Sequence, residues 1–296
     1  MAETTAQERV AAYRERLLAS RNGDGSWPYR KGIGLGESTC LALLALRAAG
    51  DEASGFAASV EWLETLRRED GGYAPQAAVG FSNWVTILAS IVMLEYGRED
   101  ASKRAVEWML GQTGIEARWV SRLTRTVGNS PAPYPQRFHG WPWVGETNAW
   151  VSPTALAAVA LLRAERVMGD ARIRERVEQA EGMLLDRRCA DGGWNYGAPE
   201  VLEVKATSYP ETTGMALVGL QTKAEESMPG AVALAQTMLA ETRVASAASW
   251  LQLALSARGI AAATGEEGAI QCRNTHDLAL RILALRALEG NNIFKA

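Results

Sequence analysis

The chain of 296 residues repeats one short motif three times, as Asp24-Gly25-Ser26-Trp27, Asp70-Gly71-Gly72-Tyr73 and Asp191-Gly192-Gly193-Trp194. Each copy follows a stretch with a helical pattern and leads into another apolar helical stretch. Glycine permits a backbone reversal, the aspartate can accept hydrogen bonds from the backbone of the turn, and the aromatic side chain can fill the seam between helices. A motif that recurs between helix pairs predicts a closed or stacked helical array.

Two kinds of helix are expected to alternate along the chain. Six apolar stretches share a polar first turn, which suits helix capping, and a body rich in Ala, Leu and Val, which requires burial on most sides. The stretches between them are amphipathic and charged, apart from a gap at 259–268 that is too short for a full helix. We therefore expect an α/α toroid with six inner and five to six outer helices, and with the chain termini near each other. The inner stretches are 37–49, 82–96, 151–164, 210–220, 245–257 and 275–288, and the outer ones are 7–20, 57–69, 101–112, 171–188 and 231–242.

Composition sets the broad class. The repeat continues without a linker, so we expect one all-α domain over residues 1–296, with an inserted loop at about 113–149. A net charge of −3 and the lack of a basic cluster in the sequence argue against a nucleic-acid partner. The sequence shows no secretory signal and no apolar run of about 18 residues, so no transmembrane segment is expected, while peripheral membrane contact stays open. The oligomeric state is left open as well.

The number and spacing of the cysteines indicate a reducing compartment. Cys40, Cys189 and Cys272 are odd in number and are not spaced as zinc ligands. We expect a cytoplasmic protein with no metal and no cofactor.

The chain resembles a known group at the residues quoted above and at the helix start Trp150-Val151-Ser152-Pro153-Thr154-Ala155. These features are similar to the prenyltransferase and squalene-cyclase repeat proteins, which include squalene–hopene and oxidosqualene cyclases and the β-subunits of protein prenyltransferases. The resemblance implies inner helix ends that converge on a central, largely apolar cavity. It does not determine the chemistry, because function resides in the site and not in the fold.

Two departures from this group limit what the resemblance implies. The cyclases carry an acidic Asp-x-Asp-Asp-Thr-Ala motif, whereas this chain has Trp150, Ser152 and Pro153 in place of its carboxylates. Neither Ser nor Trp can supply the strong acid that alkene protonation needs, so squalene cyclisation by the usual route is not expected. The protein prenyltransferases bind zinc through an Asp, a Cys and a His. His276 matches that His, but the preceding helix start at 244–248 offers no other ligand.

Closure of the ring would bring polar residues at the inner helix starts to one end of the cavity. Two glutamates at corresponding starts, Glu37 and Glu211, are expected to have raised pKa values in a dry cavity and to act as acid and base. Histidine is the side chain that ordinarily titrates near neutral pH, and His276 is followed by Asp277, so Glu37, Glu211, His276 and Asp277 are the catalytic candidates, with Glu211 first. Helix capping is the competing explanation for such residues.

The long loop at 113–149 interrupts the repeat and is rich in aromatic and basic residues. Loops of this length tend to be functional, so we expect it to cap the cavity mouth; the alternative is a plug against the outer ring. Its aromatic and basic residues are Trp119, Tyr134, Phe138, Trp141, Trp143, Arg118, Arg122, Arg125 and Arg137. Expected substrate contacts, including residues outside the loop, are Trp84, Trp141, Trp143, Trp150, Tyr209, Cys40 and Asn83.

Three functions remain open from the sequence. The first is a terpenoid-cyclase-like or prenyltransferase-like protein that handles an isoprenoid or other apolar substrate with a non-standard acid. The second is a non-catalytic lipid or isoprenoid binder, and the third is a carbohydrate-active toroid hydrolase or lyase with paired carboxylates. A dry aromatic cavity would favour an isoprenoid, an open groove lined by carboxylates would favour a sugar, and a filled interior would exclude both.

Overall fold

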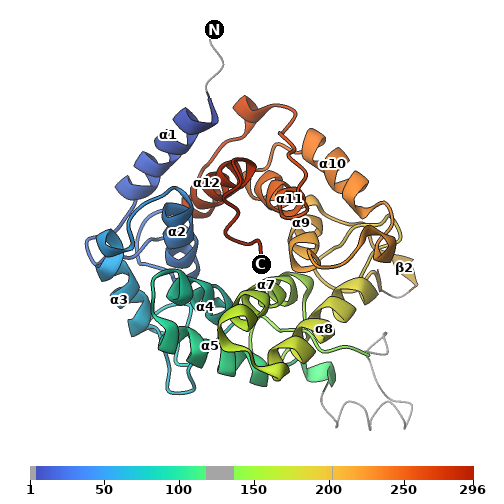
Figure 1. The fold of residues 1–296 in the computed structure, drawn as a ribbon, viewed down its shortest axis with the longest axis horizontal. Helices are drawn as coiled ribbons and strands as arrows, with labels where there is room; N and C mark the ends of the chain where they lie inside the picture. The colour runs from blue at the N-terminus through green and yellow to red at the C-terminus, as the bar shows by residue number, and fades with distance from the viewer. Residues whose placement is uncertain (1–4, 118–136, 202) are drawn as a thin grey trace.

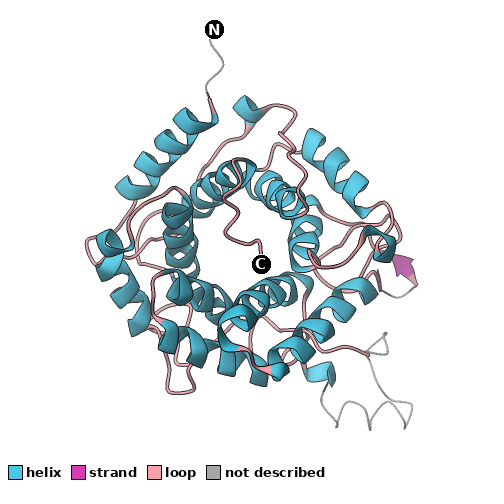
Figure 2. Ribbon diagram, in the orientation of Figure 1, coloured by secondary structure: helices cyan, strands magenta, loops and turns pink. Residues whose placement is uncertain are grey.

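The computed structural model describes residues 5–117, 137–201 and 203–296, and over these residues the chain forms an α/α toroid (Figures 1 and 2). Each inner helix packs against the next, and α12 packs against α2, which closes the ring. The expected fold is therefore confirmed. Within the described residues the inner ring consists of α2 (Gly36–Ala48), α4 (Val85–Glu95), α7 (Val151–Met168), α9 (Pro210–Gly219), α11 (Ala245–Ala257) and α12 (Thr275–Leu288).

The outer ring wraps around these helices. Its described members are α1 (Ala6–Ala19), α3 (Ala57–Thr65), α5 (Glu99–Gly111), α8 (Ala171–Asp186) and α10 (Ala231–Glu241). The short elements are the 3-10 helices η1 (Ala53–Phe56), η2 (Ile115–Ala117), η3 (Glu225–Ser227) and η4 (Glu267–Ala269), and the antiparallel strands β1 (Glu200–Val201) and β2 (Val204–Lys205).

Burial follows the two patterns of the sequence. Every residue of α4 from Val85 to Met93 is buried, whereas α8 buries one face. Full burial of a Val, Leu or Ile side chain contributes about 1.5–3 kcal/mol, so the inner ring supplies most of the apolar stabilisation.

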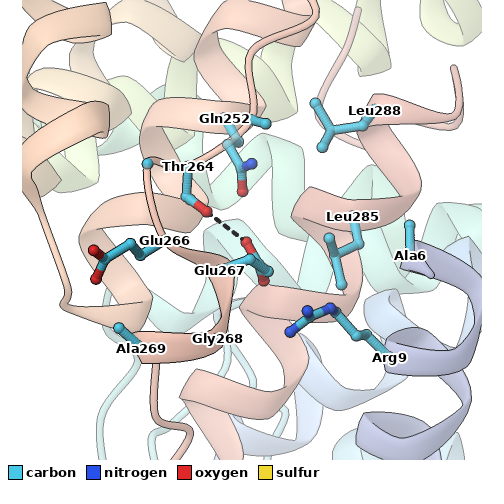
Figure 3. A pocket seen from close by; sticks show the side chains of 12 residues that line it. Ala6, Arg9, Gln252, Thr264, Glu266, Glu267, Gly268, Ala269, Leu285 and Leu288 are labelled. Carbon is cyan, nitrogen blue, oxygen red and sulfur yellow. Dashed lines mark hydrogen bonds between the residues drawn. The ribbon is translucent and has the colours of Figure 1, made fainter. Parts of the chain in front are cut away.

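The segment between α11 and α12 is too short for a full outer helix and carries η4 instead. A hollow of about 630 Å³ lies there between this segment, α1 and α12 (Figure 3). Arg281 of α12 is fully buried in this sector, where it forms an ion pair with Glu267 at 2.6 Å and a hydrogen bond to Gln252 at 2.7 Å. Charged contacts thus replace a helix–helix interface in this sector.

The repeated turns are built alike. The second residue is a glycine with φ between 89° and 98°, a conformation that favours glycine. The aspartate carboxylate accepts a hydrogen bond from the backbone N–H two residues later. The aromatic residue is fully buried, and its backbone N–H donates to a threonine hydroxyl near the start of the next inner helix. The pairs are Trp27–Thr39, Tyr73–Thr86 and Trp194–Thr213.

Trp141 belongs to a fourth copy of this turn. Its backbone N–H donates to the Thr154 hydroxyl at 2.9 Å, and its indole N–H donates to the carbonyl of Met109 in α5. The indoles of Trp27 and Trp194 likewise donate to a carbonyl of the preceding outer helix. Trp141 is 1% exposed, so this residue, which we expected to contact substrate, instead joins α5 to α7.

The C-terminal tail closes one end of the ring. It leaves α12 and turns into the centre (Figure 1), where Phe294 is fully buried and its ring packs at 5.2 Å from that of Trp250. Arg163 donates to the carbonyl of Ile293 and pairs with Glu95. The C-terminus therefore lies inside the ring while α1 begins on the outside, so the expectation that the termini lie near each other is wrong. Burial of the apolar tail residues explains this difference.

The structure covers part of the expected loop at 113–149. The described part contacts both the outer and the inner helices. The Phe138 side chain packs against Gly182 of α8, and the backbone carbonyl of Trp143 accepts a hydrogen bond from the backbone N–H of Trp84. The Trp143 side chain lies inside the inner ring of helices. Arg137 is exposed. Trp119, Tyr134, Arg118, Arg122 and Arg125 lie outside the described residues. None of the helices described is long and apolar enough to cross a membrane.

Candidate functional site

A cavity of about 290 Å³ lies inside the ring, at the end where the inner helices begin. Each inner helix contributes one side chain at its start and a second four residues later, because residues at this spacing lie on the same helix face. The cavity therefore has two layers. The upper layer consists of Glu37, Trp84, Ser152, Glu211, Ser246 and His276, with Asp277 as a further residue from α12, and the lower layer of Leu41, Leu88, Leu156, Met215, Trp250 and Leu280.

Aromatic residues from the connecting loops complete the wall. Trp143 packs edge-on against Trp84, with ring centroids 4.7 Å apart, and Tyr29 packs edge-on against His276 at 4.9 Å. Tyr196 also lines the cavity. The polar layer is therefore enclosed by aromatic rings above an apolar floor.

Glu37 and Glu211 lie on opposite sides of the cavity, because α2 and α9 are three positions apart in the ring of six described helices. Burial within the protein raises the pKa of Glu37 to about 7, and the negative charge of Glu211 adds to this effect. The Glu37 side chain keeps 36% of its surface accessible. That surface borders the cavity, where protein surrounds the carboxyl on most sides. Glu37 is thus balanced between its protonated and ionised forms near neutral pH.

Burial also raises the pKa of Glu211, and the charge of Asp277 acts in the same direction. A hydrogen bond from Ser246 acts against both and favours the carboxylate. The two glutamates therefore differ in environment: Glu37 is held towards the acid form more strongly, while Glu211 has a hydrogen-bond partner that favours its ionised form.

His276 lies between two groups of α2. Its Nδ1 is 3.5 Å from the Glu37 Oε1, and its Nε2 is 3.0 Å from the hydroxyl oxygen of Ser38. Burial lowers the pKa of His276 to about 4, so the imidazole is neutral at neutral pH. A neutral imidazole beside a carboxyl of raised pKa can orient that carboxyl without taking its proton, because the imidazole is the weaker base of the two.

Asp277 lines the cavity, but its carboxylate is engaged locally. One of its oxygens accepts from the backbone N–H of Arg273 at 2.8 Å and from the Asn274 amide at 2.9 Å. The Asn274 side chain in turn caps α12 by accepting from the backbone N–H of Asp277. These contacts match the capping alternative considered for this residue.

The structure brings together six of the residues proposed from the sequence. Glu37, Glu211, His276, Asp277, Trp84 and Trp143 all line the cavity.

Four further proposed contacts do not line it. Cys40 is fully buried in the core, and the Asn83 carboxamide oxygen accepts from the Val85 backbone N–H at the start of α4. Trp150 and Tyr209 occupy the cap positions of α7 and α9 and are 37% and 50% exposed. No group of three or more His, Cys, Asp or Glu side chains in the described part of the chain is arranged to hold a metal ion.

Sequence reasoning missed Tyr29, Tyr196 and Trp250 as lining residues. A signal for the two tyrosines was present: each follows the buried aromatic residue of a turn by two positions, as Trp143 follows Trp141. Alternate residues of an extended segment point in opposite directions, so the first ring enters the helix seam and the second enters the cavity. Trp250 could have been found from its position four residues after Ser246.

Comparisons with known proteins support the fold. No protein-family model matches the chain, and no curated protein sequence matches it. The solved structures that resemble it include the endo-beta-1,4-glucanase CMCax from Acetobacter xylinum, with a TM-score of 0.61 and 14% identity over 98% of this chain and 99% of that one. The type II terpene cyclase MstE from Scytonema has a TM-score of 0.55 and 17% identity over 85% of this chain and 71% of that one.

A third similar structure is the glycoside hydrolase family 76 mannosidase Bt3792 from Bacteroides thetaiotaomicron, with a TM-score of 0.59 and 10% identity over 97% of this chain and 98% of that one. Similarity at such low identity shows the fold alone. The chain is thus an α/α toroid protein, and this fold is used both by terpene cyclases and by glycoside hydrolases.

Proposed function

We propose that the cavity binds a small isoprenoid molecule and that Glu37 begins its isomerisation or cyclisation as a general acid, in the manner of a terpene cyclase. The two-layer cavity carries this proposal. A sugar in the lower layer would place hydroxyl groups against Leu41, Leu88 and Leu156, where they would lose hydrogen bonds to water without replacement. An isoprenoid chain has no such groups to satisfy.

The exposed apolar side chains of the connecting segments support the same substrate class. Large apolar side chains that are at least half exposed lie in the loops before the inner helices: Ile33, Phe81, Val204, Tyr209 and Val244. Exposed apolar groups favour contact with an apolar ligand or surface.

The size of the cavity favours a short substrate. Its volume of about 290 Å³ is at the lower end of the range for small-molecule sites, which starts at roughly 300 Å³. We expect a chain of two or three isoprene units.

The acidity of Glu37 indicates which atom receives the proton. A carboxyl with a pKa of about 7 is a weak acid, so an oxygen atom is a better acceptor than an unactivated alkene carbon. In the proposed reaction Glu37 protonates an epoxide oxygen, the carbon–oxygen bond breaks, and the alkene electrons close a new carbon–carbon bond. The resulting cation is stabilised by the faces of Trp84, Trp143 and Trp250. Loss of a proton to Glu211 yields a hydroxylated isomer, and exchange with water restores both carboxyls.

The test uses farnesol and its terminal epoxide as probes. We expect the wild-type protein to convert the epoxide to a product of unchanged mass, detected by gas chromatography and mass spectrometry. Glu37→Gln removes the titratable proton and should lower the rate at least about 100-fold, the usual contribution of a general acid. Glu52→Gln alters an exposed carboxyl outside the cavity and should leave the rate unchanged.

Binding is measured separately through tryptophan fluorescence, because Trp84, Trp143 and Trp250 line the cavity. Farnesol should quench the emission of wild type and Glu37→Gln alike. Quenching without turnover of the epoxide would overturn the catalytic part of the proposal and leave an isoprenoid binder. Absence of both quenching and turnover would overturn the substrate class.

One observation favours a second candidate, a glycoside hydrolase. Glu37 and Glu211 lie on opposite sides of the cavity and burial raises the pKa of both, which resembles the acid and base pair of carboxyls in such enzymes. Release of reducing ends from carboxymethyl cellulose or mannan, lost in both Glu37→Gln and Glu211→Gln, would establish this activity in place of the isoprenoid one.

A further inference from the structure

A third pocket, of about 560 Å³, is lined by cationic side chains; we call it the basic pocket. It is built from the C-terminal half of α1, the loop at 28–32 and the start of α12. None of the described residues that line it is an Asp or a Glu. Its cations are Arg16, Arg21, Arg30, Lys31 and Arg273. The sequence did not indicate this cluster, because Arg273 is far along the chain from the others.

In the described part of the chain these cations have no acidic side chain as an ion-pair partner. None of the five forms an ion pair with a carboxylate among the described residues, although many other arginines of the protein do. Arg16 is held in place by a hydrogen bond of 2.8 Å to the carbonyl of Cys272. Like charges that share a pocket repel one another, and a bound anion would remove that cost. The protein as a whole has a net charge of −3, so this positive region is local.

We propose that the basic pocket binds a phosphate or diphosphate group. Four of the five cations are arginines, whose planar guanidinium groups donate paired hydrogen bonds to phosphate oxygens. Because several cations line the same pocket, a ligand with more than one negative charge fits it better than a ligand with a single carboxylate does.

The basic pocket and the cavity share a wall. Pro28 and Arg30 line the pocket while Tyr29, between them, lines the cavity, and on the facing segment Thr275 lines the pocket while His276 lines the cavity. The two segments are joined, because the backbone N–H of Thr275 donates to the Tyr29 carbonyl at 2.9 Å and the Thr275 hydroxyl donates to the Pro28 carbonyl at 2.6 Å. An anion in the pocket would therefore bind beside the segment that positions Tyr29 and His276.

Anion binding in the basic pocket does not depend on the reaction in the cavity, so the primary test measures binding alone. Isothermal titration calorimetry of the wild-type protein with inorganic pyrophosphate should show binding whose affinity falls as the salt concentration is raised. Arg30→Ala combined with Lys31→Ala, and separately Arg273→Ala, should each weaken binding at least about tenfold through lost charge-assisted hydrogen bonds. Lys103→Ala, an exposed cation of α5 on the outer ring, is the matched control and should bind as wild type does.

Several outcomes would overturn the proposal: no binding of pyrophosphate, equal loss in Lys103→Ala, or equal affinity for sulfate at matched ionic strength. Glu37→Gln should bind pyrophosphate normally, so failure of this site and failure of the proposed reaction can be distinguished. All variants would first be compared by thermal melting; the replaced cations Arg30, Lys31, Arg273 and Lys103 are exposed, so their replacement should leave the fold intact.

Two further arms identify the source of the phosphate group. If it belongs to a molecule that also enters the cavity, geranyl diphosphate should bind more tightly than pyrophosphate and should quench tryptophan fluorescence. If it belongs to a lipid, the protein should sediment with phosphatidylglycerol vesicles but not with phosphatidylcholine vesicles, and the Arg30 and Lys31 double variant should lose that association.

Discussion

The two ends of the inner ring are formed by the same helices and yet have opposite character. At the C-terminal ends of the helices, the chain's own tail fills the centre with Phe294 and is held there by Arg163 and Gln221. At the N-terminal ends, the centre is a cavity lined by titratable groups and aromatic rings. The helices alone therefore do not decide whether the ring is filled. Whether the centre is filled depends on the segments that enter the two ends. The C-terminal tail occupies the centre at one end, whereas the connecting loops line the cavity at the other.

The largest expected effect comes from opening the closed end. Phe294→Ala removes a fully buried ring that packs against Trp250, and such a change costs about 3–5 kcal/mol of the free energy of unfolding. Urea denaturation followed by circular dichroism measures it. Phe81→Ala at the open end is the matched control: its ring is 55% exposed, so the change should stay within about 0.5 kcal/mol. Equal losses in the two variants would mean that the ends do not differ as described.

A smaller effect is expected at the turns that connect the rings. Thr154→Val keeps the shape of the side chain but leaves the buried backbone N–H of Trp141 without its acceptor, which costs about 1–3 kcal/mol. Thr65→Val removes an exposed hydroxyl that donates to the Trp62 carbonyl and should change stability by less than about 0.5 kcal/mol. Thermal melting of both variants compares them. A melting temperature of Thr154→Val equal to that of wild type would show that the fourth turn is not a structural copy of the others.

The fold was predictable from the sequence because it depends on features that repeat. Glycines with positive φ, aspartates that accept from the turn backbone and apolar helix bodies each recur at regular intervals, so every copy supports the others. The fourth turn was not recognised because Phe138-His139 replaces the usual Asp-Gly pair, although Trp141 makes the same hydrogen bonds as its counterparts in the other turns. Hydrogen bonds to backbone groups survive changes that remove the sequence signature.

The site was predictable only for residues at equivalent positions near the starts of the inner helices. Glu37, Glu211 and His276 occupy equivalent helix starts, so closure of the ring brings them together. The basic pocket is not built from equivalent positions: it joins a helix C-terminus, a loop and a distant helix start. The position of the C-terminal tail was unpredictable for a similar reason, since a short apolar segment can pack equally well inside or outside a ring.

The smallest effect concerns pH and contrasts Glu37 with its neighbour His276. Burial raises the pKa of Glu37 to about 7, above its ordinary value, so from about pH 4.5 to 6.5 the folded protein keeps a proton that the unfolded chain releases. The contribution of Glu37 to stability therefore falls as pH rises. Burial lowers the pKa of His276 to about 4, so in the same range the unfolded chain binds a proton that the folded protein does not. The contribution of His276 therefore rises with pH, and the two slopes oppose each other.

Single substitutions should reveal the opposed slopes. Wild type should show a free energy of unfolding that changes little across this range, whereas Glu37→Gln should gain stability with rising pH and His276→Gln should lose it. Each slope is at most about 1 kcal/mol per pH unit, because the side chains of Glu37 and His276 are partly accessible, at 36% and 18%, and solvent screens such groups. Urea denaturation at about pH 4.5, 5.5 and 6.5 measures these slopes. Glu211 is present in all three proteins, so its contribution to the slope is common to them. Parallel slopes in the two variants would contradict the opposed pKa shifts and would remove the basis for assigning the acid role to Glu37.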